Sequence, residues 1–577
     1  MSDRAARYEK ATGAATAVGA LLLLGPLEAR DWTISLGPLA LTFSEMLAAV
    51  AAFAGFVVLA MATREHPAVA DRLRRRLRGP VVPVLVGWAA IHLISAAWSG
   101  PDALDALKFG LRTAGGVALA LSTYAWAGER GFAERIERFV FAAIALVFAI
   151  AVLERTGGQA MEPFLGVFRA EPTWMLGEQR LSTVFYHANT MAAWVELMLP
   201  WALLGAAHRS GKRRLWPALL LLGCIWMLGL TYSRAGLAAA ILASGALWLS
   251  AATPRWRSLR WLAAGTMVLV AASYLANPDM RARLGLEDRG YDVSYAFQGR
   301  CAGDPGERVR VPVVIHNVGQ WPLSNRQAPG QLAHVVWPEE GRPDKAAFHY
   351  QQLPEVGPGE AVTLTIAIDL PEDEGAFDVI VDIRRKNVIW LSAVGVEPGR
   401  LHCVAGEMQS DGGGTVDDDE TIRLQGRPLE LERRHYWQAA LRLLAERPVF
   451  GHGADRFHML YRQFVPPRGW DGRARAHSIV VETAADLGAL GLLALGLWVG
   501  VLLAAVYGLL RQGRAGSRFG LAALVGCSAF LAHSLVDYFL AYTQILVVFW
   551  PLLGLGLGLA ETARRSHETP SGGPRDG

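Results

Sequence analysis

Charge is scarce in this chain: 19% of its 577 residues are Asp, Glu, Lys or Arg, whereas 52% are hydrophobic. Soluble domains usually carry about a quarter charged residues, so the balance excludes an ordinary soluble protein. The net charge of +4 says little by itself, because in a membrane protein the placement of charge matters more than its sum. Cysteine is also rare, and two of the four, Cys224 and Cys527, lie in apolar runs, where we expect small core residues.

The familiar signatures of soluble enzymes are missing as well. The chain has no P-loop, no GxSxG, no HExxH and no CxxC. Histidines such as His92, His208 and His533 are scattered, without the spacing that is typical of metal ligands. We therefore expect structural or interfacial roles for them and predict neither a metal site nor a cofactor.

Apolar runs long enough to cross a bilayer are abundant, and such a run needs about 20 residues. About twelve are present. They are centred on residues 11–27, 38–62, 81–98, 106–127, 137–154, 188–207, 215–232, 236–252, 261–276, 483–510, 519–536 and 539–560. These runs predict a polytopic α-helical membrane protein with about 12 transmembrane helices. We expect the first run to be retained, because no small-residue cleavage site follows it.

Basic residues alternate between the loops that join these runs. Alternate loops are rich in arginine and lysine, as in 64–78 and 209–214, whereas the intervening short loops carry only a handful. This pattern favours an even number of spans with both termini in the cytoplasm of a bacterial inner membrane, and it places residues 277–482 in the periplasm. It also accounts for the run RLRRRLR (72–78), so that run predicts topology rather than nucleic-acid binding.

The long periplasmic loop contains a strand-rich stretch. Apolar and polar residues alternate with period two over 307–317, 361–369 and 376–385, which predicts strands. About seven short strands in about 100 residues predict an immunoglobulin-like antiparallel β-sandwich, inserted between helices 9 and 10. Cys301 and Cys403 bracket it. In an oxidising periplasm they are candidates for a disulfide, and two unpaired thiols are the alternative.

The tryptophans of this module have two interpretations. Trp321, Trp337 and Trp390 either bind polysaccharide through their aromatic faces or pack within the strands.

These patterns divide the chain into five parts. They are the first nine helices (1–290), the β-module (291–404), a periplasmic helical segment (405–482), the last three helices (483–563) and a disordered cytoplasmic tail (564–577).

Four ionisable residues fall near the predicted outer membrane face: Arg180, Arg234, Arg433 and His477. Arginine matches phosphate oxygens with a planar fork, and histidine exchanges a proton near neutrality. Together they suit an anionic ligand with a diphosphate at headgroup level. The simpler interpretations are headgroup anchors for the first two, a solvated helix for Arg433 and its neighbour Arg434, and a helix cap for His477.

Two further cations lie inside a predicted span. Lys108 and Arg112 either add positive potential to a wet cavity or pair with Asp102 or Asp105.

Four segments together resemble the superfamily of O-antigen ligases and O-antigen polymerases. They are RLSTVFYHAN (180–189), LTYSRAG (230–236), RRHYWQAALRLLAERPVFGHGADRF (433–457) and AHSIVVETAADLGALGLL (476–493). The first resembles Arg-Leu-Ser-Gly-Thr-Phe-x-x-Pro-Asn, with Thr183, Val184 and Ala188 in place of the usual Gly, Thr and Pro. In the last, Ser478 and Asp486 replace the usual Asn and Glu. The resemblance covers roughly 1–290 and 420–560, and the β-module is an insertion relative to it.

The resemblance implies an outer-leaflet glycosyltransferase. Members move a glycan from polyprenyl (undecaprenyl) diphosphate to an acceptor hydroxyl, without nucleotide or metal. Ligases use lipid A core sugars as acceptor, and polymerases use the growing glycan. By resemblance Arg234, Arg433 and His477 are the catalytic residues. The candidate substrate-binding residues are Arg180, Asn189, Ser233, Arg434, Lys108 and Arg112.

We favour a ligase, and a repeat-unit polymerase is the first alternative. A transporter of lipid-linked oligosaccharides is less favoured, because we see neither internal repeats nor helices broken at mid-membrane. A non-catalytic scaffold whose β-module binds envelope glycans is the remaining alternative.

Overall fold

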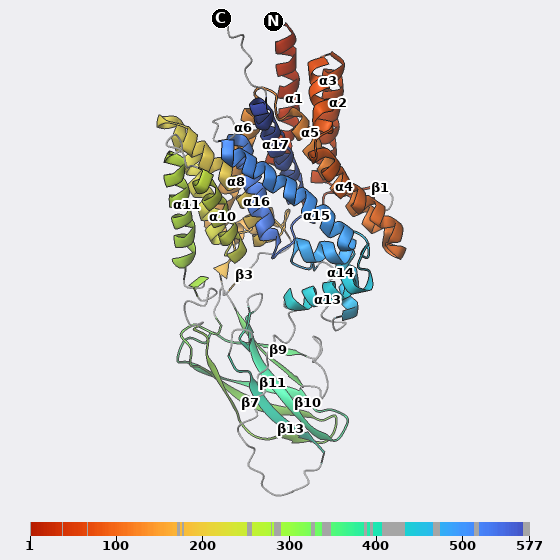
Figure 1. The fold of residues 1–577 in the computed structure, drawn as a ribbon. Coiled ribbons are helices and arrows are strands. Elements are labelled where there is room, and N and C mark those ends of the chain that lie inside the picture. The colour runs from red at the N-terminus through yellow and green to blue at the C-terminus, as the bar shows by residue number, and fades with distance from the viewer. Residues whose placement is uncertain are drawn as a thin grey trace, which may run out of the picture.

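The computed structural model describes most of the chain. The described residues are 2–36, 39–65, 67–169, 174–175, 178–250, 257–277, 280–281, 290–324, 329–336, 348–385, 389–392, 396–406, 433–464, 474–512 and 518–568. Figure 1 shows that the helices form one end of the molecule and that a strand module forms the other.

Each predicted apolar run overlaps a helix. These helices are α1 (Ser2–Leu24), α2 (Phe43–Glu65), α4 (Val81–Ile94), α5 (Ala103–Trp126), α6 (Phe132–Gly157), α8 (Ala188–His208), α9 (Leu215–Leu230), α10 (Arg234–Ser250), α11 (Arg257–Leu275), α15 (Ile479–Gln512), α16 (Arg518–Ser534) and α17 (Thr543–Glu568). Within the described residues, 8 helices are long and apolar enough to cross a membrane. The fold is therefore that of a polytopic helical membrane protein, and the count of about twelve spans stays a prediction. Helix α17 continues five residues into the range predicted as a tail, and 569–577 lie outside the described residues.

Helices α8 and α17 form the centre of the helical part. In each, 94% of the apolar window is buried by the rest of the protein. Helix α17 packs along α5 and α16, and α8 packs against α9 and α16. Their outer ends therefore lie in the middle of one face of the bundle.

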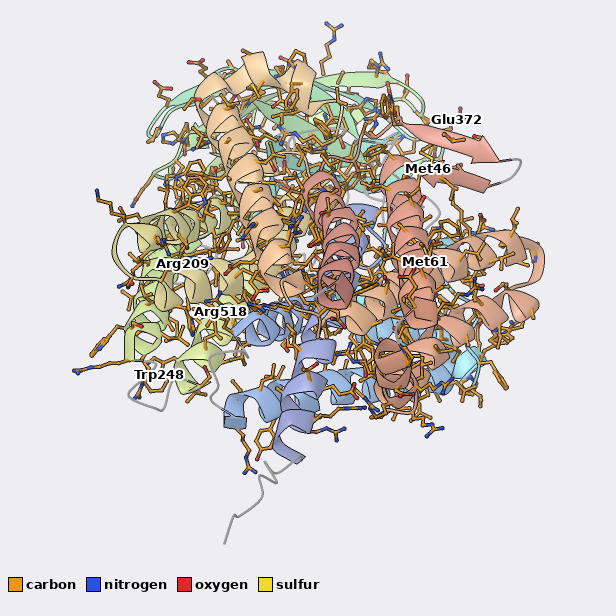
Figure 2. All side chains as sticks on the ribbon, turned by 90° about the horizontal axis from the view of Figure 1, so that it is seen from above. Met46, Met61, Arg209, Trp248, Glu372 and Arg518 are labelled. Carbon is orange, nitrogen blue, oxygen red and sulfur yellow. A yellow bond between two sulfur atoms is a disulfide. The ribbon has the colours of Figure 1, made fainter. Side chains whose placement is uncertain are left out.

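The opposite ends of the helices carry the basic residues on which the topology prediction rests. Arg209 follows α8, Trp248 lies near the end of α10 and Arg518 begins α16, and Figure 2, which looks down on the bundle from above, shows the three on one flank of it. Helix α3 (Pro67–Leu77) holds most of the RLRRRLR run, and one of its arginines is an exception to a purely topological role. Arg76 is buried and donates to the backbone oxygens of Tyr124 and, at 2.8 Å, of Ala125. It thereby satisfies carbonyls that the end of α5 leaves without helical partners.

Helix α15 is broken at Gly488, where φ is 62° and ψ is −155°. A break of this kind leaves carbonyls before it and N–H groups after it without helical partners. Residues 448–453 supply those partners, through Ala489 N to Pro448 O (2.8 Å), Leu490 N to Val449 O (3.2 Å), His452 N to Ala485 O (3.2 Å) and Gly453 N to Asp486 O (2.7 Å). A Cβ on Gly451 or Gly488 would clash with the facing backbone. Two glycines of the third and fourth segments are thus required by direct contact between main chains.

The strand module has two sheets. One has the order β10-β7-β5, and the other has the order β6-β13-β11-β8-β9 with β12 paired to β11. The strands are β5 (Val293–Phe297), β6 (Cys301–Gly303), β7 (Arg308–Asn317), β8 (Gly330–Val336), β9 (His349–Gln352), β10 (Ala361–Asp369), β11 (Gly375–Arg385), β12 (Ile389–Trp390) and β13 (Gly399–Ala405). Alternate residues of β7, such as Val311 and Val313, share one core with Val379 and Val381 of β11. The immunoglobulin-like class and the periplasmic location of the module remain predictions.

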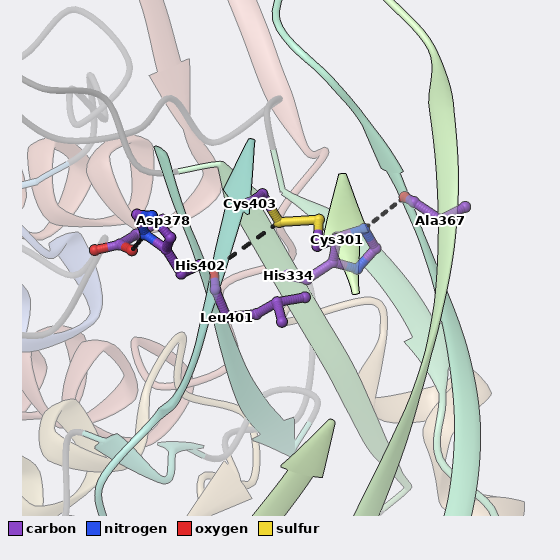
Figure 3. The surroundings of a disulfide bond; sticks show 7 residues. All are labelled: Cys301, His334, Ala367, Asp378, Leu401, His402 and Cys403. Carbon is purple, nitrogen blue, oxygen red and sulfur yellow. Dashed lines mark hydrogen bonds and ion pairs between the residues drawn. A yellow bond between two sulfur atoms is a disulfide. The ribbon is translucent and has the colours of Figure 1, made fainter. Parts of the chain in front are cut away.

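A disulfide joins Cys301 to Cys403, whose Cα atoms are 4.6 Å apart (Figure 3). The two residues are in register in the parallel pair of β6 and β13. The other neighbouring strands of both sheets pair antiparallel. The disulfide therefore ties the first strand of the larger sheet to the last.

Two of the three tryptophans in the module pack inside it. Trp321 contacts the ring of Tyr291 edge-on at 5.0 Å, and Trp390 is buried against Phe348 at 5.5 Å. Both arrangements favour packing over a glycan-binding role. Trp337 lies outside the described residues.

Candidate functional site

Asp537 joins two of the four segments. It lies in the turn between α16 and α17, and its Oδ2 accepts a hydrogen bond from Asn189 Nδ2 at 3.0 Å. Its Oδ1 lies 3.3 Å from His477 Nδ1. Burial opposes ionisation, but the hydrogen bond and charge of His477 outweigh it and lower the pKa of Asp537. Asp537 is therefore a carboxylate at neutral pH that orients both Asn189 and His477.

Arg180 is held by uncharged partners. Its side chain is buried, its Nε donates to Thr231 O at 2.6 Å, and its Nη2 donates to Asn189 Oδ1 at 2.6 Å. Burial lowers the pKa of Arg180 to about 10, so the guanidinium stays protonated at neutral pH. The direct partners of the cation are thus a carbonyl and an amide, and the carboxylate of Asp537 attracts it from beyond Asn189.

The first two segments lie against each other. Leu181 N–H donates to Leu230 O at 2.9 Å. Ser233 Oγ accepts from Gly236 N at 3.2 Å, so this predicted substrate-binding hydroxyl caps helix α10. Arg234 is the first residue of α10 and is exposed. Arg234 therefore lies at a helix N-terminus, where anion binding is favoured.

Helix α13 (Arg433–Glu446) brings the third segment to His477. The Tyr436 ring meets the His477 ring edge-on at 5.3 Å, and Trp437 Nε1 donates to Ala476 O at 2.9 Å. Residues three and four apart share a helix face, so Arg433 lies on the face that docks on the fourth segment. Arg433 and Arg434 are both exposed.

Among the described residues, four other than glycine have a left-handed backbone, and each of the four segments holds one. They are Thr183 (φ 49°), Tyr232 (φ 51°), Asp455 (φ 63°) and His477 (φ 52°). Such conformations cost energy and cluster at functional sites. At Thr183 the resembling segments usually have glycine, which adopts this backbone freely. Here Glu154 Oε2 accepts the Thr183 N–H at 2.8 Å.

Carboxylates of α15 hold the backbone around His477. Glu482 Oε2 accepts from Ala476 N at 2.9 Å, and its Oε1 pairs with Arg475 at 3.2 Å. Asp486 accepts three backbone N–H groups, from Asp455 (2.8 Å), Arg456 (3.1 Å) and Phe457 (2.7 Å). These two acidic residues of the fourth segment therefore position the site.

The two cations predicted inside α5 differ from expectation. Arg112 Nε donates to Glu45 Oε1 at 2.5 Å, and its Nη1 donates to Ala541 O at 3.2 Å. Its carboxylate partner is thus Glu45 of α2 and not Asp102 or Asp105, and Asp102 pairs instead with Arg456. Lys108 is half-buried on the same helix. The partner carboxylate makes Arg112 a weaker candidate for anion binding than Arg180.

Sequence reasoning missed Asp537, Tyr436 and Trp437. One signal was available for Asp537, since an acidic residue between two apolar runs usually faces a functional interior. Among the described residues, no cluster of three His, Cys, Asp or Glu side chains is placed to hold a metal ion.

Comparison with known proteins gives one family. Residues 388–496 match the sequence model described as O-antigen ligase, and that range contains Arg433 and His477. No curated protein matches the chain. Among solved structures, the chain is similar to Pseudomonas fluorescens alkylpurine DNA glycosylase AlkC bound to DNA containing an abasic site analog, with 10% identity over 58% of this chain and 98% of that chain. The TM-score of 0.15 supports neither a shared fold nor a shared function.

Proposed function

We propose that the chain, whose residues 388–496 match the O-antigen ligase family model, transfers a glycan from polyprenyl diphosphate to an acceptor hydroxyl. One observation carries the proposal: Asn189 and Asp537 link Arg180, whose direct hydrogen-bond partners are uncharged, to His477. A cation and a proton acceptor are thereby held in one site.

The leaving group of this transfer is a diphosphate, whose negative charge grows as the glycosidic C–O bond breaks. Arg234 and Arg433, exposed on the ends of α10 and α13, bind its oxygens in this proposal, and Arg180 adds positive potential from within. Fixed positive groups stabilise the developing charge without reorganising. No covalent nucleophile is required, because the acceptor oxygen displaces the diphosphate directly.

His477 is placed to take the proton of the acceptor hydroxyl. Its Nδ1 faces Asp537, and a carboxylate at that nitrogen favours the tautomer with the proton on Nδ1. Nε2 then carries the free lone pair and is able to act as base. After proton transfer, the same nitrogen is able to donate a hydrogen bond to the departing diphosphate.

The proposal includes a location and an acceptor. The site faces the periplasm of a bacterial inner membrane, with both termini in the cytoplasm, and the Cys301–Cys403 disulfide supports an oxidising compartment for the loop. We propose lipid A core sugars as acceptor, which makes the protein a ligase, and a growing glycan as the alternative.

Alanine substitution of Arg234, Arg433 and His477 tests the transfer. Each variant should lose glycan transfer in membranes while protein level and membrane insertion stay normal. Arg442→Ala is the matched control, because Arg442 is an exposed arginine of the same helix as Arg433. Normal transfer in all three variants would overturn the proposed function.

The polysaccharides of a deletion strain separate the two acceptors. Long chains that are not attached to the core indicate a ligase, and single repeat units indicate a polymerase. A periplasm-dependent reporter fused near Gly357 tests the topology, and silence there would reverse the orientation.

A further inference from the structure

Two tyrosines stack at the edge of the site. Tyr186 belongs to the first segment and Tyr542 to the turn that carries Asp537. Their ring centroids are 5.9 Å apart and their planes differ by 29°. The Tyr186 side chain is 38% exposed, although the residue before it, Phe185, is fully buried. Tyr542 thus braces a large aromatic ring that remains open to the outside.

Hydrogen bonds fix both tyrosines relative to the site. Gln544 Nε2 donates to Val184 O at 2.7 Å, and therefore ties the start of α17 to the chain two residues before Tyr186. Asn189, three residues after Tyr186, holds Asp537 at 3.0 Å. On the other side, Arg112 Nη1 donates to Ala541 O next to Tyr542, at 3.2 Å. The exposed ring is therefore held beside the carboxylate that orients His477.

We propose that Tyr186, braced by Tyr542, is the platform on which the donor's first sugar ring stacks. This inference rests on the proposed function and names the sugar subsite of the same site. The C–H groups of a pyranose face carry partial positive charge and match the negative face of an aromatic ring. Tyr186 shares its segment with Arg180 and Asn189, next to the proposed diphosphate site, and the sugar bonded to that diphosphate must lie beside it.

The platform also bears on specificity. Tyr186 occupies one of the two variable positions in the resembling segment Arg-Leu-Ser-Gly-Thr-Phe-x-x-Pro-Asn. The diphosphate and its polyprenyl chain are common to all donors of this class, whereas the first sugar differs. A variable aromatic position beside a shared anion site is suited to selecting that sugar.

Binding to the full-length chain in lipid nanodiscs tests the proposal with two probes. One is undecaprenyl diphosphate that carries a single N-acetylglucosamine, and the other is undecaprenyl diphosphate alone. Tyr186→Ala should weaken binding of the sugar-bearing probe by about tenfold and leave the bare probe unchanged. Tyr186→Phe should bind both probes as the unmodified chain does, because stacking needs the ring and not the hydroxyl.

Tyr507→Ala is the matched control, because Tyr507 is an exposed tyrosine on α15 and should affect neither probe. Equal weakening of both probes by Tyr186→Ala, or no weakening of the sugar-bearing probe, would overturn the platform. Arg234→Ala separates this result from the proposed function, because loss of the diphosphate site weakens both probes together. If Arg234→Ala changes neither probe, the diphosphate site is wrong, and the difference between the probes still decides the role of Tyr186.

Discussion

Two buried arginines of the same predicted periplasmic face have opposite surroundings. Arg169 is 1% exposed and donates to Glu154 Oε1 at 2.9 Å, to Glu162 Oε1 at 2.8 Å and to Ser182 Oγ. Arg180 donates only to neutral oxygens of Thr231 and Asn189 within the described residues. The chain thus places one arginine among carboxylates and the other, eleven residues later, among dipoles.

The difference separates a structural cation from one that is available to a ligand. Carboxylates neutralise the charge of Arg169, so this residue exerts little electrostatic attraction on an anion outside the protein. Carbonyl and amide oxygens fix the position of Arg180, and no carboxylate among the described residues forms a direct ion pair with it, so its guanidinium is better able to attract an anion. Arg475 belongs with Arg169, because Asp455 and Glu482 pair with it.

The largest effect is expected when Arg169 is replaced. Arg169→Ala leaves Glu154 buried without its cation, and loss of one partner from a buried pair costs about 3–5 kcal/mol. The free energy of unfolding should fall by that amount, and the protein level in membranes should fall with it. Thermal unfolding in detergent measures the change, and an unaltered melting temperature would show that this cluster is not structural.

Arg180→Ala should affect activity more than folding. Removal of a fixed positive group from a site of developing charge lowers the rate by about 10²–10³-fold. Arg180→Lys keeps a charge but loses the planar fork, and should give an intermediate rate. Transfer and thermal unfolding are to be measured on the same preparations. A loss of stability as large as that of Arg169→Ala would erase the contrast between the two arginines.

Asp537→Asn should lower transfer by about tenfold or more, because His477 loses the acceptor-only carboxylate that fixes its tautomer, and an amide is able to present an N–H to Nδ1 instead. The pKa of Asp537 is lowered in the folded protein, so its carboxylate stabilises the fold at pH above the ordinary value of about 4. That contribution is lost as pH falls below this value. The stability difference between Asp537→Asn and the unmodified chain should therefore shrink in acid, as urea titrations at several pH values would show. A constant difference would contradict the ionised state assigned to Asp537.

His187→Asn should give the smallest effect. His187 Nδ1 accepts from Asn189 N at 3.1 Å, and burial lowers its pKa to about 4. Between pH 6.5 and about 4 the unfolded state binds a proton that the folded state does not, so stability falls with falling pH in this window. The variant keeps an acceptor for the cap and lacks the titration. It should be more acid-resistant by about 2 kcal/mol at pH 5, and equal acid sensitivity would exclude His187 as the cause.

Helices and strands were predictable where a single physical pattern dominates. Each apolar run of membrane length overlaps one of the long helices of the bundle, and the period-two stretches overlap β7, β10 and β11. The extent of α17 was not predictable, because its last residues, from Arg564 to Glu568, are polar or charged and resemble a tail. The break at Gly488 was hidden as well, because the partners of its freed backbone groups come from 448–453.

The site was predictable as four segments and not as a network. Each segment has a local pattern, but the link from Arg180 through Asn189 and Asp537 to His477 depends on three contacts between distant parts of the chain. The partner of Arg112 was missed for the same reason. Sequence spacing offers only the acidic residues near α5 as partners, whereas Glu45 comes within reach only through the packing of α2. Spacing along a helix cannot report a neighbour on another helix.

The disulfide that closes the strand module bears on how the module is connected to the helical bundle. Cys301 lies near the point where the chain enters the module, and Cys403 lies near the point where it leaves, with Cα atoms 4.6 Å apart. Insertions whose two ends meet are tolerated best by their hosts. The module therefore resembles an ordinary loop in that the chain enters and leaves it at neighbouring points. A related bundle could gain, lose or exchange such a module without moving a helix.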